Sequence, residues 1–301
     1  MTAPLRWGVV GTGGIASDFC QALTHSCCEV VNVAGSSPDK ARAFAARFGI
    51  AAWSHGLAQL LAAPGVDAVY IATPHPMHEG HALASIAAGR HVLCEKPLTM
   101  DERSAARVIA AARRAGVFLM EAYMYRCHPL VPELLSRLND GAIGPIRHVR
   151  ADFGFRAARV GEHRLFSPAL GGGSILDVGG YPVSFARLIA GVAGRVPFAE
   201  PVALTGSGLI GPTGVDELAS AHLTFASEVT ATVTSAVSYD IGTSAAVFGE
   251  HGRIVLPNPW FPSGHRHALE TGFTVYRDGR DPESVTVRAD KATYAILFQI
   301  L

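Results

Sequence analysis

A lysine that follows a short apolar run is the first residue that could do chemistry. The sequence has only three lysines, Lys40, Lys96 and Lys291, and takes the rest of its positive charge from arginine. Lys96 follows His91–Cys94, which has the pattern of a buried strand, and Glu95 stands beside it. A lysine can shift its pKa when desolvated and can donate or share a proton, which an arginine cannot do. Lys96 is therefore a candidate catalytic residue, and an ion pair with Glu95 at a strand end is the simpler alternative.

A carboxylate and a phenol at helical spacing form a second candidate pair. Asp177 and Tyr181 follow the run Gly171–Ser174 and are four residues apart, so a helix places them on one face. Gly179 and Gly180 lie between them, and each costs about 1 kcal/mol relative to Ala inside a helix. Such glycines indicate that something packs close to the helix backbone. By spacing alone, a local cap at Asp177 and a core aromatic at Tyr181 are the slightly better explanation.

The turn after the first apolar run has the spacing of a dinucleotide-binding site. Leu5–Val10 is typical of a strand buried on both faces of a parallel sheet, and a helix is predicted from Ser17 to Thr24. The segment between them has the pattern G-x-G-x-x-A. Its glycines permit a tight turn and let backbone N–H groups approach a pyrophosphate at the helix N-terminus. The predicted pyrophosphate-binding residues are Gly11, Thr12, Gly13, Gly14, Ile15 and Ala16.

The second predicted strand, Val30–Ala34, ends without the acidic residue that holds the ribose 2′-hydroxyl in NAD-preferring folds. Ser37 has the features of a helix N-cap, and Asp39 is better explained by a place in the first turn of that helix. Ser36, Ser37 and Lys40 could instead receive a 2′-phosphate. We therefore expect NADP in preference to NAD, although the arginine that usually holds this phosphate is absent.

Strands and helices then alternate up to residue 121. Further strands are predicted at residues 66–72, 91–94 and 117–120, and helices up to Ala88 and from Asp101 to Ala115. This alternation predicts right-handed crossovers and a parallel sheet, whose ligands bind beyond the carboxyl ends of the strands. Thr73, Lys96 and Glu121 stand at such ends. Residues 1–121 are therefore predicted to be an NAD(P)-binding Rossmann domain in which these three side chains line one crevice.

Three histidines, His75, His78 and His81, have a spacing that resembles metal ligands. The first two fall in a loop and the first turn of a helix, and His81 falls on a different edge of that helix. No converging set of carboxylates or cysteines accompanies them. We therefore expect no metal, and we expect His75 or His78 to face a cofactor.

The pattern changes after Glu121. Helices are predicted at 125–139 and 175–190, and strands at 145–155, 202–207, 216–225, 228–237, 244–249, 252–256, 272–277 and 284–288. The closely spaced strands alternate apolar and polar residues, which predicts an antiparallel sheet with one covered face. Residues 122–301 are therefore predicted to be an α/β substrate-binding and oligomerisation domain. The expected fold class is α/β, with an N-terminal Rossmann parallel sheet followed by an α+β domain that has an open, mostly antiparallel sheet.

Composition restricts the partners and the compartment. Acidic and basic residues balance at 25 each, so no global charge favours nucleic acid or an anionic membrane. No apolar run approaches the length of a membrane span, and the first one is too short for a signal peptide. The five cysteines form an odd set without metal-ligand spacing, which fits reduced thiols. We expect a cytoplasmic protein that acts on a small molecule and binds neither nucleic acid nor a membrane.

These motifs, in this order, resemble the glucose-fructose oxidoreductase and inositol dehydrogenase family, GFO/IDH/MocA. The resemblance is carried by Gly11–Ala16, Thr73-Pro74-x-x-x-His78, Cys94-Glu95-Lys96-Pro97-Leu98, Glu121–Pro129 and Gly171–Pro182. It covers residues 5 to 260 and is nearest to the branch of dihydrodiol dehydrogenases, xylose dehydrogenases and anhydrofructose reductases.

The resemblance implies an NAD(P)-dependent oxidoreductase that transfers a hydride between nicotinamide and a carbinol or carbonyl carbon of a sugar, polyol or cyclic diol. It also implies a homo-oligomer, a dimer or tetramer, formed through the open C-terminal sheet. The expected cofactor-binding residues are Gly11, Thr12, Gly13, Gly14, Ile15, Ala16, Ser36, Ser37, Lys40, Thr73, Pro74, His75, His78, Glu95, Lys96, Glu121 and Arg164.

Lys96, Asp177 and Tyr181 match the family positions that meet the reacting carbon and the substrate. We expect Tyr181 to act as acid and base while Lys96 polarises the substrate oxygen, and the reverse assignment stays open. Asp177 is expected to orient substrate hydroxyls or Lys96. Many relatives have His at position 181, Asn at position 75 and Arg near Ser36, so the proton-transfer residue and the cofactor preference vary within the family.

Two further expectations follow from the resemblance. Some family members bind NAD(P) without catalysis, so a sensor or regulatory protein is the alternative function. The presence of Lys96, Asp177 and Tyr181 together favours the enzyme. The ending Lys291–Leu301 lacks the final amphipathic helix that the family leads us to expect, so a segment near that end is either missing or remodelled.

Overall fold

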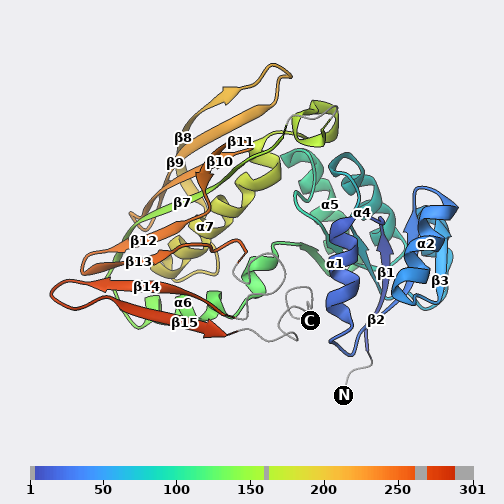
Figure 1. The fold of residues 1–301 in the computed structure, drawn as a ribbon, viewed down its shortest axis with the longest axis horizontal. Helices are drawn as coiled ribbons and strands as arrows, with labels where there is room; N and C mark the ends of the chain where they lie inside the picture. Colours follow the sequence, from blue (N-terminus) through green and yellow to red (C-terminus); the bar gives the residue numbers. More distant parts are fainter. Residues whose placement is uncertain (1–3, 159–162, 262–269, 289–301) are drawn as a thin grey trace. The chain divides into compact units, whose positions relative to one another are not determined.

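The computed structural model describes residues 4–158, 163–261 and 270–288 (Figure 1). The described chain divides into two compact units between Met124 and Tyr125. Each unit contains one sheet, and each is described by itself. The ending Lys291–Leu301 lies outside the described residues.

The first unit is built on a parallel sheet of six strands in the order β3-β2-β1-β4-β5-β6. The strands are β1 (Arg6–Val10), β2 (Glu29–Gly35), β3 (Ala52–His55), β4 (Ala68–Ile71), β5 (His91–Cys94) and β6 (Leu119–Glu121). The helices are α1 (Gly14–Leu23), α2 (Pro38–Phe48), α3 (Leu57–Ala62), α4 (His78–Ala87) and α5 (Glu102–Ala115). The strand order reverses between β1 and β4, which is the point where doubly wound sheets bind dinucleotides. The predicted Rossmann sheet is confirmed.

The apolar runs of this unit form its central strands. Every residue of β4 is buried, and Val9, Val69 and Ile71 have no exposed surface. These strands are covered on both faces, as the continuous apolar runs predicted.

Two elements of the first unit were not predicted. Strand β3 lies at the sheet edge and has only one buried residue, Ser54, so it lacks the apolar pattern of a central strand. Helix α3 has six residues, too few for a clear helical period. Helix α1 also begins at Gly14, earlier than the predicted Ser17, because the glycine turn itself forms the first helical turn.

The second unit is built on a mixed sheet of nine strands in its described residues. Their order is β15-β14-β13-β12-β7-β10-β9-β8, and β11 pairs with β7. The strands are β7 (Ile146–Arg156), β8 (Pro201–Ile210), β9 (Asp216–Phe225), β10 (Thr230–Ala236), β11 (Ser238–Gly242), β12 (Ala245–Gly249), β13 (Gly252–Leu256), β14 (Glu270–Arg277) and β15 (Glu283–Arg288). Only the β7–β10 pair is parallel, so the predicted mostly antiparallel sheet is confirmed.

Helices α6 (Leu130–Asn139) and α7 (Gly180–Gly194) belong to this unit. The predicted helix over 125–139 was wrong at its start, because Pro129 separates a short 3-10 turn at Met124–Cys127 from α6. The predicted helix over 175–190 begins with a single π turn, Ile175–Gly179, and continues as α7.

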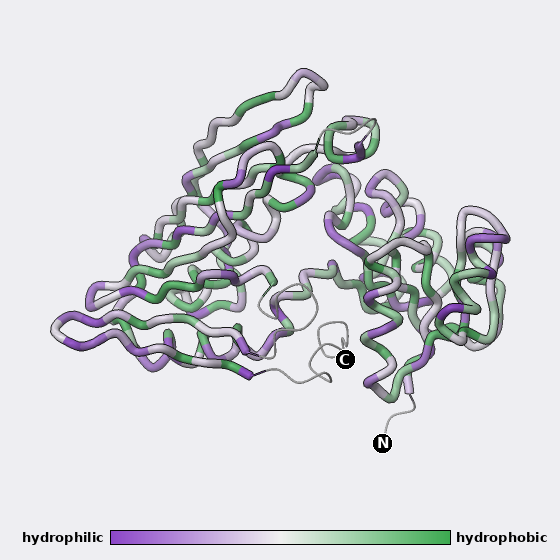
Figure 2. Tube along the Cα trace, viewed as in Figure 1, coloured by the Kyte–Doolittle hydropathy of each residue, from purple (hydrophilic) through white to green (hydrophobic). Residues whose placement is uncertain are grey.

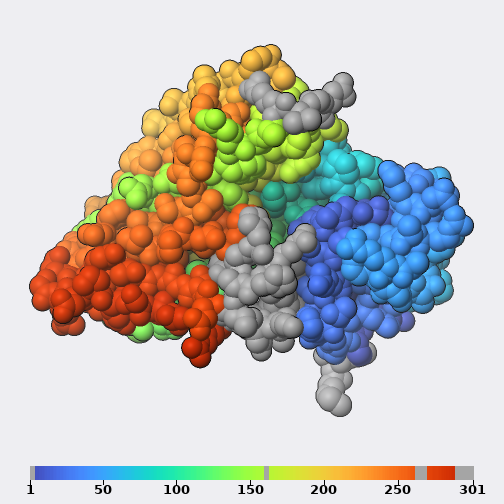
Figure 3. Space-filling model, viewed as in Figure 1, coloured from blue at the N-terminus to red at the C-terminus, as the bar shows by residue number. Residues whose placement is uncertain are grey.

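Helix α7 packs on one face of the second sheet, against β7 and β10. Along β10, Ala231 and Val233 are buried, while Thr230, Thr232 and Thr234 are partly exposed on the opposite face. Figure 2 shows the same alternation of hydrophobic and hydrophilic residues along the strands. In Figure 3 the strands β12–β15, coloured orange to red, form the lower part of the surface of the unit on the side that faces the viewer.

The helical run Pro168–Gly194 has the length and hydropathy of a membrane span, and 67% of its most apolar window is buried inside the protein. Burial of this extent is expected of a core helix.

Candidate active site

The glycine turn between β1 and α1 leaves room for an anion. Gly11 has φ +112°, and a Cβ there would lie 2.3 Å from the carbonyl oxygen of Ala72, so only glycine fits. A Cβ on Gly13 or Gly14 would meet nothing within 4 Å among the described residues. Helix α1 starts at this open side with Gly13 as its N-cap, so no side chain caps its first N–H groups. An open helix N-terminus without a cap fits the pyrophosphate of a dinucleotide.

The end of β2 has the arrangement that the sequence predicted. Ser37 is the N-cap of α2, and its Oγ accepts a hydrogen bond from the backbone N–H of Lys40 at 3.3 Å. Asp39 lies in the first turn of α2 and pairs with Arg42, so it has a local role. Ser36 and the side chain of Lys40 are exposed. Their contact with a 2′-phosphate stays a prediction.

Glu95 is buried directly beside Lys96 at the end of β5. Its Oε1 accepts a hydrogen bond from the hydroxyl of Tyr70 at 2.7 Å, and its Oε2 accepts one from the backbone N–H of Lys96 at 3.3 Å. Burial raises the pKa of Glu95, and the Lys96 charge and the Tyr70 hydroxyl oppose this effect. Burial also raises the pKa of Tyr70 well above its ordinary value, so Tyr70 stays a donor. Tyr70 and Glu95 therefore hold the backbone from which the half-buried Lys96 extends.

Glu121, at the end of β6, supports the same loop from the other side. Its Oε1 accepts a hydrogen bond from the backbone N–H of Leu98 at 2.8 Å. Burial raises the pKa of Glu121, the Leu98 N–H opposes this, and the charge of Glu95 adds to it. Glu121 therefore positions the loop that follows Lys96, and a direct cofactor contact from its side chain stays a prediction.

The histidines after β4 connect two loops. His78 is fully buried, with Nδ1 2.7 Å from the carbonyl oxygen of Pro97 and Nε2 2.8 Å from that of Thr73. Burial lowers the pKa of His78 despite these two carbonyls. The hydroxyl of Thr73 lies 3.2 Å from Nδ1 of His81. These contacts give His78 a positioning role between the Thr73 and Lys96 loops, while His75 lies beside it with ring centroids 5.7 Å apart.

No group of three His, Cys, Asp or Glu side chains is arranged to hold a metal ion in the part of the chain that the structure describes. All five cysteines lie in that part and are free.

In the second unit, Asp177 is paired with Arg164. The Arg164 guanidinium donates from Nη2 to Oδ1 of Asp177 at 2.9 Å; the Asp177 side chain is 5% exposed and that of Arg164 is 51% exposed. Asp177 lies in the π turn Ile175–Gly179, just before α7. The prediction placed Arg164 toward the cofactor, and sequence reasoning missed this ion pair because the residues are 13 positions apart and only short 3-10 turns, Arg164–Phe166 and Pro168–Leu170, lie between them.

Tyr181 stands in a cage of aromatic rings. Its ring centroid lies 5.9 Å from that of Tyr125, 5.3 Å from Phe153 and 6.1 Å from Trp260. Trp260 is itself fixed by a hydrogen bond from Nε1 to the carbonyl oxygen of Asp152 at 2.9 Å. The phenol ring is therefore held rigidly, as a proton-transfer group requires. The sequence did not identify Tyr125 or Phe153 as walls of this cage.

The predicted site residues thus form two sets. In the first unit, the glycine turn, Thr73, Glu95, Lys96 and Glu121 all lie at the carboxyl edge of one parallel sheet. In the second unit, Arg164, Asp177 and Tyr181 lie in or beside the start of one long helix.

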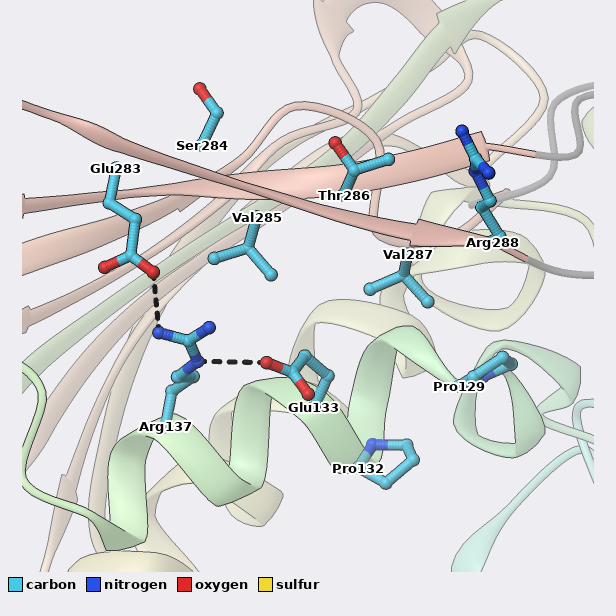
Figure 4. A pocket seen from close by; sticks show the side chains of 10 residues that line it. All are labelled: Pro129, Pro132, Glu133, Arg137, Glu283, Ser284, Val285, Thr286, Val287 and Arg288. Carbon is cyan, nitrogen blue, oxygen red and sulfur yellow. Dashed lines mark hydrogen bonds and ion pairs between the residues drawn. The ribbon is translucent and has the colours of Figure 1, made fainter.

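A further pocket of the second unit contains none of these residues. It lies between α6 and β15 (Figure 4), where Val285 and Val287 point toward the helix. Arg137 pairs with Glu133 within α6 at 2.9 Å and, across the pocket, with Glu283 on β15 at 2.7 Å. The Arg137–Glu283 pair connects α6 with β15, and the two ion pairs together explain the polar lining of the pocket.

Comparison with known proteins agrees with both units. Residues 5–123 match the model of the oxidoreductase family with an NAD-binding Rossmann fold, and residues 132–255 match the GFO/IDH/MocA C-terminal domain. Trans-1,2-dihydrobenzene-1,2-diol dehydrogenase of Mus musculus is 36% identical over 262 residues, which cover 86% of this chain and 76% of the relative. The Homo sapiens protein of the same name is 35% identical over 263 residues, with the same two shares.

Two solved structures are also similar. The 3-ketoreductase KijD10 of Actinomadura kijaniata, in complex with NADP and TDP-benzene, has a TM-score of 0.83 and 30% identity, and covers 98% of this chain and 87% of its own. The aldose-aldose oxidoreductase of Caulobacter crescentus, complexed with glycerol, has a TM-score of 0.85 and 25% identity, and covers 98% and 88%. With the glycine turn and the sheet order, these matches show that the chain belongs to the GFO/IDH/MocA family of NAD(P)-dependent oxidoreductases.

Proposed function

We propose that this protein is an NADP-dependent dehydrogenase or reductase that acts on a carbinol or carbonyl carbon of a cyclic diol, sugar or polyol. The observation that carries the proposal is the carboxyl edge of the first sheet. There an open glycine turn that fits a pyrophosphate lies on the same edge as Lys96, which extends from a loop held by Tyr70, Glu95 and Glu121. A sheet edge that combines an anion cradle with a positioned lysine fits hydride transfer beside a bound dinucleotide.

The preference for NADP rests on the end of β2. No acidic residue is available there for a ribose 2′-hydroxyl, because Asp39 lies in α2 and pairs with Arg42. Ser36, Ser37 and Lys40 instead offer hydroxyl groups, a helix N-terminus and a cation to a phosphate. The similar 3-ketoreductase structure contains NADP, which supports the same preference.

The substrate class rests on the relatives and on two functional groups. The relatives act, by name, on a cyclic trans-diol, and the similar structures belong to a ketoreductase and an aldose oxidoreductase. The common chemistry is a secondary hydroxyl group, or its ketone, next to another oxygen-bearing carbon. The Arg164–Asp177 pair presents a cation and a carboxylate that suit such neighbouring hydroxyl groups.

The cofactor transfers the hydride, and the side chains of the protein transfer the proton and polarise the substrate. When bound, the nicotinamide accepts or supplies the hydride. Tyr181 takes the hydroxyl proton during oxidation and returns it during reduction, and Lys96 polarises the substrate oxygen. A free phenol has a pKa near 10 and is a poor base at neutral pH, so Tyr181 needs positive charge nearby when it ionises.

The proposal is tested by cofactor binding followed by turnover. NADPH and NADH are titrated by fluorescence, and the protein is then assayed with trans-cyclohexanediols, inositols and aldoses in both reaction directions. We expect NADPH to bind at least tenfold more tightly than NADH, and we expect turnover of at least one vicinal diol. Tyr181→Phe should lower kcat by roughly 10²-fold or more, because general acid–base catalysis contributes about that much.

The outcomes separate this proposal from the alternative function. Tight NADPH binding without turnover of any compound in the panel would favour a sensor or regulatory protein. Tighter binding of NADH than of NADPH would contradict the role of Ser36, Ser37 and Lys40.

We also propose that the protein forms a homodimer through the open face of the second sheet. In support, this face carries partly exposed side chains from its central strands, among them His148 and Thr232, instead of charged residues throughout. His148 packs on Phe248, with ring centroids 5.8 Å apart, and its Nδ1 lies 2.9 Å from Oγ1 of Thr230. An open face of this mixed polar and aromatic character suits an isologous interface.

A further inference from the structure

The glycine run before Asp177 is attached to the first residue of a distant strand. Asp216, at the start of β9, accepts two hydrogen bonds on Oδ2: one from the hydroxyl of Ser174 at 2.7 Å and one from the backbone N–H of Ile175 at 2.8 Å. Ser174 has no exposed surface. Ile175 is the first residue of the π turn, so the carboxylate of Asp216 caps the helical run that carries Asp177 and Tyr181.

Three oxygen atoms lie within hydrogen-bond distance of the Ser174 hydroxyl: Oδ2 of Asp216 at 2.7 Å, Oγ of Ser235 at 2.9 Å and the carbonyl oxygen of Ser235 at 3.2 Å. The shortest of these contacts, to Asp216, is the one to which we assign the Ser174 proton. A carboxylate accepts and cannot donate, so the hydroxyl of Ser174 donates to Asp216. The hydroxyl of Ser235, on β10, lies 2.9 Å from Oγ of Ser174 and must therefore donate to it. The result is a chain of hydrogen bonds from Ser235 through Ser174 to Asp216, in which both serines are buried and Asp216 is partly buried.

The glycines of the run are required by this attachment. Gly173 has φ +106°, and a Cβ on it would lie 2.2 Å from Oδ1 of Asp216. A Cβ on Gly172 would lie 2.6 Å from the carbonyl oxygen of Leu165 and 2.8 Å from that of Arg164. The run is thus pressed between Asp216 on one side and the backbone of Arg164 on the other.

Strand β10 also contacts the far end of the π turn. A Cβ on Gly179 would lie 3.2 Å from Oγ of Ser235, so that glycine packs directly against β10. Ser235 therefore touches the chain before the π turn, at Ser174, and at its last residue. Asp177 lies between these two contacts, and its own backbone N–H bonds to the carbonyl oxygen of Gly173 at 3.2 Å.

We propose that Asp216, acting through Ser174 and Ser235, is a positioning residue for the reaction, because it fixes the turn that presents Asp177 to Arg164. This inference rests on the proposed oxidoreductase function. Asp216 does not itself need to touch substrate or cofactor. Its effect is on the placement of Asp177, and displacement of a catalytic group by about 1 Å can lower turnover about 10²-fold.

The test is a double-mutant cycle. Asp216→Asn and Asp177→Asn are made singly and together, and kcat/KM, NADPH affinity and Tm are measured for each. We expect Asp216→Asn to lower kcat/KM roughly 10- to 100-fold while NADPH affinity changes by less than about threefold. In the Asp177→Asn background the same change should lower kcat/KM by less than about threefold, because the residue that Asp216 places is already inactive. Equal losses in both backgrounds would overturn the proposal.

Hydrogen exchange gives a readout that does not need activity. We expect the backbone amides of residues 174–179 to exchange at least tenfold faster in Asp216→Asn than in the wild type, with the amides of α6 unchanged. Hydrogen exchange can be measured even if the wild type turns over no substrate. In that case the proposed function fails, but the exchange rates still show whether Asp216 holds the turn. Unchanged exchange at Ile175 would overturn the attachment itself.

Matched controls use the same chemistry at unrelated sites. Asp140→Asn changes an exposed aspartate at the end of α6 that is 3.4 Å from the hydroxyl of Ser136. Ser220→Ala removes a hydroxyl on the open face of β9, and Ser235→Ala removes one on the helix-covered face of β10. We expect the first two variants to keep wild-type kcat/KM and Ser235→Ala to lose at least threefold. An equal loss in Ser220→Ala and Ser235→Ala would contradict the proposal.

Discussion

At the scale of single residues, the buried charges of the first unit all support one loop. Glu95 and Glu121 receive hydrogen bonds from Tyr70 and from the backbone of Lys96 and Leu98. Burial raises the pKa of both carboxyl groups, so their placement needs these donors to offset the loss of hydration. The simpler reading of Lys96, a strand-end cation paired with Glu95, is therefore incomplete, because Glu95 is already held by Tyr70.

Replacing Lys96 tests what its charge and its proton each contribute. Lys96→Met should lower kcat/KM by roughly 10²-fold or more, because it removes a group that stabilises developing charge on the substrate oxygen. Lys96→Arg keeps the charge but cannot release a proton. If Lys96 polarises the substrate oxygen, steady-state kinetics should show partial activity in Lys96→Arg. If Lys96 relays the proton, Lys96→Arg should lose as much kcat/KM as Lys96→Met. NADPH affinity should stay within a few-fold of the wild type, and undiminished turnover in Lys96→Met would rule out the assignment.

His128 should make the stability of the second unit depend on pH. It has no exposed surface, its Nδ1 accepts the backbone N–H of Leu130 at 3.0 Å, and burial lowers its pKa from 6.5 to about 4. The unfolded chain therefore binds one more proton than the folded chain between these pH values. The stability contributed by neutral His128 is complete above pH 6.5 and is lost as the pH falls toward 4, by at most about 3 kcal/mol.

Chemical unfolding between pH 4 and pH 7.5 checks this prediction. In His128→Asn, the side-chain amide oxygen can still accept the Leu130 N–H and does not titrate, so the free energy of unfolding should fall less steeply with acid than in the wild type. His55→Asn, at an exposed position on β3, should keep the wild-type slope. The same slope in all three proteins would show that His128 does not control acid stability.

At the scale of elements, the turn between β1 and α1 contains one glycine that the fold requires and one that only a bound ligand would require. Gly11 is needed by the fold, because a Cβ there would collide with the backbone of Ala72. Gly13 has an ordinary extended backbone conformation, with φ −84° and ψ −173°, and the space beside it is open among the described residues. The fold therefore tolerates a side chain at Gly13. A ligand that approaches the helix N-terminus would collide with that side chain.

The variants Gly11→Ala and Gly13→Ala should consequently differ. Gly11→Ala should lower Tm markedly, since both its φ and its contact with Ala72 are unfavourable. Gly13→Ala should change stability by no more than about 1 kcal/mol, the usual effect at an N-cap. It should nevertheless weaken NADPH binding at least tenfold in the fluorescence titration. Unchanged NADPH affinity in Gly13→Ala would mean that the pyrophosphate does not approach this turn.

At the scale of the whole molecule, the two sheets differ in what covers them. The first sheet is parallel, and its central strands are buried on both faces by helices. In the second sheet, α7 packs on one face and the described part of the chain leaves the other face partly exposed. The proposed homodimer would cover that face with the same face of a second copy.

Thr232→Arg tests this association. Thr232 lies on the open face of β10, opposite Arg150 on β7 and His222 on β9, so an added arginine brings a bulky like charge to the centre of the face. Light scattering after size exclusion should show a dimer for the wild type and a monomer for Thr232→Arg. Ser136→Arg, on the exposed side of α6, should remain a dimer. A wild-type protein that is monomeric at micromolar concentration would exclude the proposed interface.

The sequence by itself determined the features that depend on neighbouring residues. The order of strands and helices, the glycine turn, the N-cap at Ser37 and the position of Lys96 at a strand end were all predicted, because each is set by residues that are adjacent or one helical turn apart. Weak or short patterns failed: the edge strand β3, the six-residue α3 and the helix start before Pro129 have no clear period.

Only the tertiary structure decided which distant groups hold the candidate site. Tyr70 reaches Glu95 across 25 positions, Arg164 reaches Asp177 across 13, and Asp216 reaches Ile175 across 41. Such contacts depend on sheet register and on which strands become neighbours, and no local pattern encodes either. The residues that do the proposed chemistry could therefore be named from the sequence, whereas the residues that keep them in place became visible only when β4 lay beside β5 and β9 beside β10.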